Sequence, residues 1–172
     1  MDIVREIIKK VEKLKAEKNF SKAVQILQNT LVEHGSDYRI YEEIADIYLY
    51  EWKIQKASKA VDFALKTNPE SATGNYLKGF ILLSKNKVKE SISYLENSNQ
   101  LMPNNAEVLR NLGWAYTMVW NHQKWICILK RALNLSPNDT LITEDLAMAL
   151  IWLWNVSEWN DLLAKIWKNI TI

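Results

Sequence analysis

The prolines of this chain recur at one fixed interval. Pro69, Pro103 and Pro137 are the three prolines among its 172 residues, and they stand 34 residues apart. A proline ends a helix because it cannot donate a backbone hydrogen bond and disfavours a helical residue before it. A fixed period of this length is the sequence pattern of a repeat protein. The spacing therefore predicts an array of 34-residue units, each closed by a loop at its proline.

The units are predicted to be helical. Four glycines and three prolines leave few turns, and apolar residues recur at intervals of three and four rather than two. The fold class expected is all-α, with about ten helices near residues 2–17, 20–34, 38–50, 54–67, 72–85, 88–101, 105–118, 122–135, 139–152 and 156–169. Four residues are predicted to be N-caps, because their short polar side chains stand where helices begin. They are Asp37, Ser71, Asn105 and Asp139.

Placing each proline at repeat position 32 divides the chain into five units, 4–37, 38–71, 72–105, 106–139 and 140–172. In the fourth unit, positions 7, 8, 11, 24, 27 and 32 hold Leu112, Gly113, Tyr116, Leu129, Ala132 and Pro137. The second unit is comparable, with Ile44, Ala45, Tyr48, Val61, Ala64 and Pro69. This order of large, small, aromatic, large, small and proline resembles the tetratricopeptide repeat (TPR) family. The resemblance covers the whole chain.

The resemblance implies a single TPR domain over 1–172, folded as a right-handed α-superhelix, or solenoid, of five antiparallel helix pairs. In such a domain, positions 2, 5, 9, 12 and 13 of each first helix face a concave groove. A scaffold that binds a peptide or helix of another protein in this groove is the expected function, without enzymatic activity. The groove residues predicted to bind the partner are Tyr50, Tyr76, Phe80, Arg110, Asn111, Trp114, Met118, Met148 and Trp152. The Lys and Asn clamp by which some TPR proteins grip a terminal carboxylate is not matched, because Asp46 and Phe80 stand at position 9.

The composition excludes several other classes of function. Lys and Arg number 22 against 20 Asp and Glu, and this balance gives no basic field for nucleic acid or an anionic membrane. The longest apolar run, Leu146 to Trp154, is too short to span a bilayer. The charged N-terminal segment lacks the apolar stretch of a signal peptide, and a single cysteine fits a reducing compartment. A cytoplasmic protein is expected.

No catalytic or metal-binding set of residues stands out, so no enzyme, cofactor or metal is predicted. His34 and His122 each lack a second ligand at metal-binding spacing, and His122 is interpreted as a packing residue at a helix start. Cys127 lies within the apolar run Trp125 to Leu129 and is expected to be a small buried side chain.

The C-terminal helix suggests an alternative function. It carries Leu162, Leu163, Ile166, Trp167 and Ile170, and no polar capping helix follows it. Apolar surface that is left uncovered at the end of a repeat array is expected to bind a partner. A structural module that self-associates through this helix is therefore the alternative to the peptide-binding scaffold. A third possibility is that the helix folds back onto the fifth unit.

Five tryptophans stand where the repeat pattern calls for a small residue. Position 15, a turn that needs a left-handed backbone, holds Trp52, Trp120 and Trp154, and position 20 holds Trp125 and Trp159. A bulky residue in either place costs roughly 1 to 3 kcal/mol. Two explanations stay open. The tryptophans form an aromatic ridge for binding, or the source is a bacterium that reads UGA as glycine and these positions are glycine in its own protein.

Overall fold

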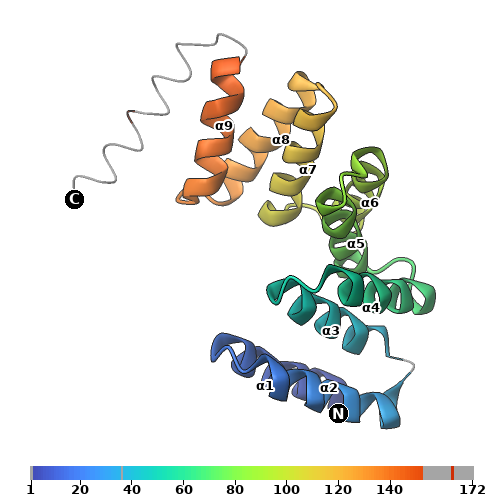
Figure 1. The fold of residues 1–172 in the computed structure, drawn as a ribbon. Helices are drawn as coiled ribbons and strands as arrows, with labels where there is room; N and C mark the ends of the chain where they lie inside the picture. Colours follow the sequence, from blue (N-terminus) through green and yellow to red (C-terminus); the bar gives the residue numbers. More distant parts are fainter. Residues whose placement is uncertain (1, 36, 153–163, 165–172) are drawn as a thin grey trace. The chain divides into compact units, whose positions relative to one another are not determined.

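The computed structural model describes residues 2–35, 37–152 and 164, and this part of the chain is helical without a strand. The all-α fold class is thereby confirmed. The tenth predicted helix, 156–169, lies outside the described residues except for Ala164. The described helices are α1 (Ile3–Ala16), α2 (Phe20–His34), α3 (Tyr38–Tyr50), α4 (Ile54–Thr67), α5 (Ala72–Ser84), α6 (Val88–Leu101), α7 (Ala106–Met118), α8 (His122–Leu135) and α9 (Thr140–Trp152) (Figure 1).

All four predicted N-caps are confirmed. Each cap residue uses a side-chain oxygen to accept a hydrogen bond from a backbone N–H in the first turn of its helix, which satisfies one of the donors left free there. The N–H groups of Arg39, Gly74, Glu107 and Leu141 donate to Asp37, Ser71, Asn105 and Asp139, respectively. The helix starts are therefore fixed locally by the sequence.

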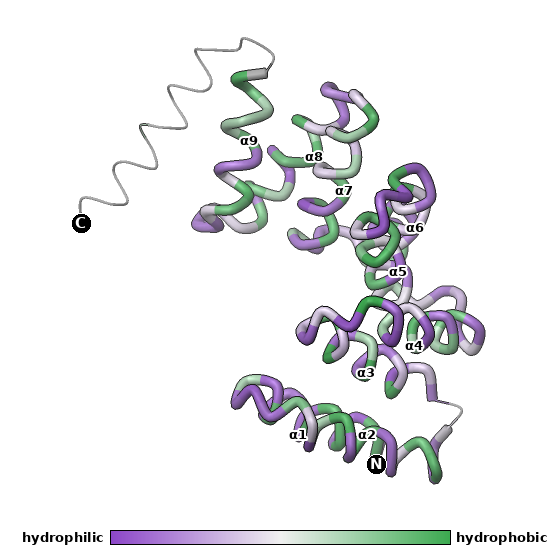
Figure 2. Tube along the Cα trace, viewed as in Figure 1, coloured by the Kyte–Doolittle hydropathy of each residue, from purple (hydrophilic) through white to green (hydrophobic). Residues whose placement is uncertain are grey.

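Two compact units make up the chain, Met1–Lys85 and Asn86–Ile172, and the boundary falls inside the third predicted repeat. The single domain over 1–172 stays a prediction. In both units the hydrophobic and hydrophilic segments alternate along the helices, as amphipathic packing requires (Figure 2).

The core of the first unit depends on small residues where helices meet. Ala45 of α3 and Ala57 of α4 are fully buried at the predicted crossing of these two helices. Gly74 of α5 allows a further close approach, because a Cβ atom there would lie 2.9 Å from Leu65 Cδ2 and 2.9 Å from Glu42 Oε1. The first helix of the third repeat thus packs on the helix pair before it, which is how stacked repeats share one core.

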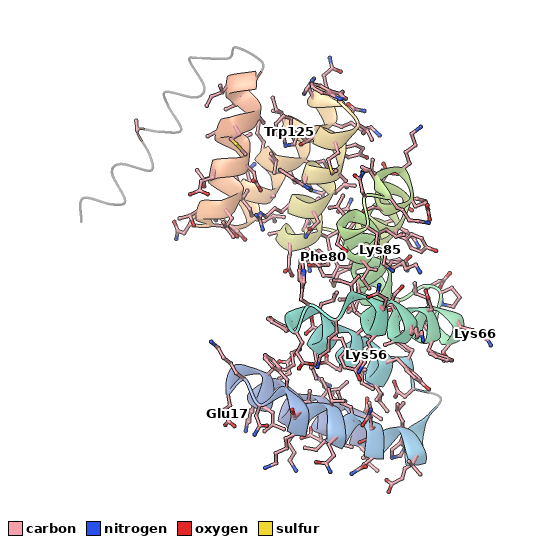
Figure 3. All side chains as sticks on the ribbon, in the orientation of Figure 1. Glu17, Lys56, Lys66, Phe80, Lys85 and Trp125 are labelled. Atoms are coloured by element: carbon pink, nitrogen blue, oxygen red, sulfur yellow. The ribbon has the colours of Figure 1, made fainter. Side chains whose placement is uncertain are left out.

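In the second unit a glycine makes room for a tryptophan. Trp125 of α8, labelled in Figure 3, is buried. A Cβ atom at Gly113 of α7 would lie 3.6 Å from Trp125 Cδ1 and 3.1 Å from Leu129 Cδ2. The absence of a side chain at Gly113 therefore lets α7 and α8 pack with a large ring between them. Trp159, the other tryptophan at repeat position 20, lies outside the described residues.

The predicted burial of Cys127 is wrong, because the structure exposes this residue. The apolar neighbours of Cys127 in the sequence do not share its side of the helix. Trp125, Leu129 and Ala132 form the buried face of α8. Successive residues of an α-helix are rotated by about 100°. Cys127 therefore lies on the opposite side of α8 from Trp125.

The left-handed turn predicted at repeat position 15 is confirmed. Trp52 and Trp120 have φ angles of 58° and 59°, and Lys18 and Asn86, at the same position of the first and third repeats, both have 58°. The turn between the two helices of a repeat therefore has one backbone conformation in four repeats, whichever side chain it carries. Trp154 lies outside the described residues.

Candidate functional site

In the first unit, the predicted groove residues differ in their exposure. Tyr50, at the end of α3, is largely exposed, and its ring stacks on Phe20 with the centroids 5.9 Å apart. Tyr76 of α5 is partly buried and packs against the core of the unit. Phe80, also of α5 and labelled in Figure 3, is half-buried. Tyr50 is therefore the predicted residue of this unit that offers most of its ring to a partner.

In the second unit, apolar side chains line the groove positions of both first helices. Trp114 and Met118 of α7 and Met148 of α9 are 40–47% exposed, although each is large and apolar. Leu141 and Ile151 of α9 are exposed to about half and belong to the same set. We call these five residues the apolar surface. The backbone of Trp152 ends α9, but its side chain is not among those described.

Leu141 and Ile151 are not among the nine residues predicted to bind the partner, although the repeat register places both at positions that face the groove. They occupy groove positions 2 and 12 of the fifth repeat. The prediction favoured aromatic, Met and polar residues at these positions, and aliphatic residues in an array of apolar helices are usually core. The structure distinguishes core residues of α9 from exposed ones. The buried side of α9 is formed by Ile142, Leu146, Ala149 and Leu150. Helix α9 is thus apolar on both sides.

An ion pair joins the two first helices of the second unit. Nε of Arg110 in α7 donates a hydrogen bond to Oδ2 of Asp145 in α9 at 3.0 Å. Asn111 uses its side-chain amide to donate to the backbone oxygen of Glu107 at 2.9 Å. Arg110 therefore has its charge balanced by a neighbour, and Asn111 is engaged within its own helix.

Each unit has a cavity beside the starts of two of its first helices. The cavity of the second unit has a volume of about 570 Å³ and lies beside the N-terminal ends of α7 and α9, where Glu107, Arg110, Asp139 and Leu141 line it. The cavity of the first unit, of about 370 Å³, lies beside the corresponding ends of α3 and α5. The residues that line the first-unit cavity are Ile8, Tyr38, Arg39, Glu42, Glu43, Asn68, Glu70, Ser71, Ala72 and Thr73.

Glu42 is the most deeply buried carboxylate at these cavities. It is 7% exposed, and the hydroxyl of Ser71, the N-cap of α5, donates a hydrogen bond to it. Burial raises the pKa of Glu42, because an ionised carboxylate is poorly solvated there, and the hydrogen bond from Ser71 offsets only part of this effect. Burial raises the pKa of the neighbouring Glu43 as well, although Lys15 lies 3.1 Å from that carboxylate.

The other candidate groups of the sequence do not come together. His122 begins α8 and packs between aromatic rings, with its centroid 5.7 Å from that of Trp120 and 6.0 Å from that of Trp125. Among the residues that the structure describes, no three His, Cys, Asp or Glu side chains are arranged to hold a metal ion. None of the described helices is long and apolar enough to cross a membrane.

Comparisons with known proteins agree with the repeat register. The family described as "Psidin, N-terminal TPR repeats region" matches residues 39–169. No curated protein sequence matches the chain.

Solved structures resemble the chain along most of its length. MamA 41-end from Desulfovibrio magneticus RS-1 is 18% identical with a TM-score of 0.79, and the match covers 98% of this chain and 95% of that one. PilF of Pseudomonas aeruginosa is 19% identical with a TM-score of 0.81, over 94% and 75% of the two chains. YrrB, described as a TPR protein with an unusual peptide-binding site, is 16% identical with a TM-score of 0.71, over 92% and 82%. At such identities the likeness shows the helical-repeat solenoid fold.

Proposed function

The chain belongs to the family of the Psidin N-terminal TPR repeats region, and we propose that it is a non-enzymatic scaffold that binds a peptide or helix of another protein. The binding site is the set of groove positions on its first helices. The apolar surface of α7 and α9 carries this proposal. Its five large side chains are 40–51% exposed, although the fold offers core positions on the same two helices.

The chemistry of the apolar surface suits a polypeptide partner. A rigid tryptophan such as Trp114 is the kind of side chain that dominates binding energy when a partner covers it. Met118 and Met148 add flexible, polarizable groups that adapt to different apolar side chains. Large apolar side chains that a protein leaves exposed together can mark an interaction site. A peptide or an amphipathic helix laid across α7 and α9 would cover these side chains.

The test compares two exposed tryptophans, Trp114 at 46% and Trp52 at 69%. Trp114→Ala removes the tryptophan ring of the apolar surface, whereas Trp52→Ala removes an exposed ring from the turn between α3 and α4. A polypeptide captured from the source organism by the wild-type chain is identified, synthesised and titrated against each variant. Trp114→Ala should weaken binding at least about tenfold, and Trp52→Ala should leave it unchanged.

Circular dichroism must show the same helicity in both variants, so that a loss of binding is not a loss of fold. Equal affinities of the Trp114→Ala and Trp52→Ala variants would contradict the groove proposal. Tyr76→Ala would not serve this test, because Tyr76 packs against the core and its truncation would destabilise the fold.

The second candidate function, self-association through Trp167 and Ile170, concerns side chains outside the described residues. It stays a prediction of the sequence. Sedimentation at tens of micromolar, with and without Ala at both positions, would test it. A wild-type monomer would rule it out.

A further inference from the structure

The groove positions of the second unit change character along the helices. Towards the ends of α7 and α9, positions 9 to 13 hold the apolar Trp114, Met118, Met148 and Ile151. Towards the starts of the same helices, positions 2 and 5 hold Glu107, Arg110 and Leu141, which line the cavity of about 570 Å³, and Glu144. A partner that lies along these helices would contact an apolar end and a charged end.

The charged end of the second unit carries an excess of negative charge. Arg110 is the one cation among its groove positions, and Asp145 already balances that charge. Glu107 and Glu144 are exposed, and neither forms an ion pair within the described part of the chain. Asp139, on the wall of the cavity, accepts hydrogen bonds from the backbone N–H groups of its own helix. Among the described residues, these three carboxylates therefore have no positive partner.

The cavity of the first unit is also bordered by carboxylates, although Lys15 already pairs with one of them, Glu43, at 3.1 Å. This cavity of about 370 Å³ is lined by Glu42, Glu43 and Glu70 and by one cation, Arg39. The guanidinium of Arg39 is already held by two carboxylates, 2.6 Å from Asp37 and 2.5 Å from Asp2. Glu42 is 93% buried, since 7% of it is exposed, and it forms no ion pair among the described residues. Both cavities are thus bordered by more carboxylates than cations, although the charged residues at repeat positions 2 and 5 differ between them.

We propose that the partner segment is both apolar and basic, with lysine or arginine side chains at the starts of the first helices and apolar side chains against the apolar surface. This inference rests on the proposed function and adds the charge of the partner to it. Opposite charge speeds encounter and selects among partners that share the same apolar pattern, because like charges placed together cost free energy. A neutral partner that covered Glu107 and Glu144 would bury their charges without a positive partner. A basic side chain of the partner would pair with these charges instead.

Two synthetic probes test the charge preference. Both are fluorescent helical peptides of about 18 residues, five helical turns, with the same leucine stripe. One has lysine at every polar position and the other has glutamate. In fluorescence anisotropy at low salt, the lysine peptide should bind about tenfold more tightly than the glutamate peptide. The preference should shrink as salt screens the charges.

Three variants distinguish the effect of the groove carboxylates on binding from the effect of the net charge of the protein. Glu107→Gln with Glu144→Gln raises the net charge by two and should reduce the lysine preference several-fold. Glu90→Lys raises the net charge equally on α6, which contributes no groove position, and should leave the preference unchanged. Trp114→Ala should weaken binding of both peptides, because both use the apolar surface.

The possible failures are distinguishable. Equal binding of the two peptides, still weakened by Trp114→Ala, would overturn the basic preference and leave the peptide-binding proposal standing. An effect of Glu90→Lys as large as that of the groove pair would also overturn the preference, because net charge alone would explain it. If neither peptide bound, both proposals would fail for helical partners.

Discussion

Trp52 and Trp120, two repeats apart in the sequence, have the same left-handed backbone, with φ angles of 58° and 59°. Lys18 and Asn86 have 58° at the equivalent position. Four different neighbourhoods thus produce one conformation, which shows that the turn between the paired helices imposes the angle. Asparagine tolerates this region, whereas a tryptophan in it is strained.

Replacing Trp52 by glycine should stabilise the protein. The left-handed conformation destabilises a non-glycine residue by roughly 1 to 2 kcal/mol. Glycine avoids this cost, but its greater conformational freedom in the unfolded chain offsets part of the gain in stability. The side chain of Trp52 is largely exposed, so little packing is lost. We expect a gain of about 1 kcal/mol and a rise in Tm of about 2 to 4 °C, measured by thermal unfolding.

Trp120→Gly and Asn86→Gly are the matched comparisons for Trp52→Gly. Trp120 packs edge-on against His122, so its gain should be smaller. Asn86 should change little, because asparagine already tolerates the angle. A loss of stability in Trp52→Gly would show that its ring contributes packing. The intact mass of protein from its own host decides whether these positions are tryptophan or glycine there.

The ion pair between Arg110 and Asp145 should contribute modestly to stability. The Arg110 side chain is about one third exposed, and pairs of this kind are worth up to about 1 kcal/mol. In a double-mutant cycle of Arg110→Ala and Asp145→Ala, measured by urea unfolding, we expect a coupling free energy of about 0.5 kcal/mol. Salt should reduce it. A coupling near zero would mean that the pair does not hold α7 against α9.

Replacing Glu42 by glutamine should make stability less dependent on pH. Because burial raises the pKa of Glu42, the folded protein binds this proton more tightly than the unfolded chain does. Its contribution to stability is therefore complete below the ordinary value of 4.5 and is lost as the pH rises through the folded pKa. The midpoint of urea unfolding of Glu42→Gln should equal that of the wild type in acid and exceed it at neutral pH.

The matched control for Glu42→Gln is Glu17→Gln, which removes one carboxylate from an exposed site of the same unit (Figure 3). A wild type that is more stable than Glu42→Gln at neutral pH would contradict the prediction. It would mean that the hydrogen bond from Ser71 outweighs the cost of burying the charge.

Ser71→Ala should cost more stability than Asn105→Ala. Both residues cap a helix, and losing either cap costs about 1 kcal/mol. The hydroxyl of Ser71 also donates to the buried Glu42, which would be left without this donor. We expect a loss of about 2 kcal/mol for Ser71→Ala in chemical denaturation. Equal losses would indicate that the bond to Glu42 adds nothing net.

Most of the fold was predictable because its determinants are local. Helix periodicity and N-caps depend on residues that lie within a few positions of one another, and the spacing of the prolines shows how the units repeat. The cap residues are Asp37, Ser71, Asn105 and Asp139. The left-handed turn at position 15 followed from the repeat register. Cys127 was predicted incorrectly, because its apolar neighbours in the sequence belong to a different side of α8.

The site was less predictable than the fold. The register placed Trp114, Met118 and Met148 at groove positions, and the structure exposes all three. The register alone does not show that Tyr76, at a groove position, packs against the core. Nor does it show that Asp145 of the next repeat balances the charge of Arg110. Both facts depend on which side chains of neighbouring repeats meet, and the identity of one position does not carry that information.

The sequence by itself determined the repeat length, the helices and their caps, since each depends on residues that are near one another along the chain. Tertiary structure alone decided which apolar side chains are buried and which charges are paired. Exposed Leu141 and buried Ile142 are adjacent in the sequence and alike in chemistry. Their different environments come from the packing of α9 against its neighbours, because burial is a property of the assembled helices.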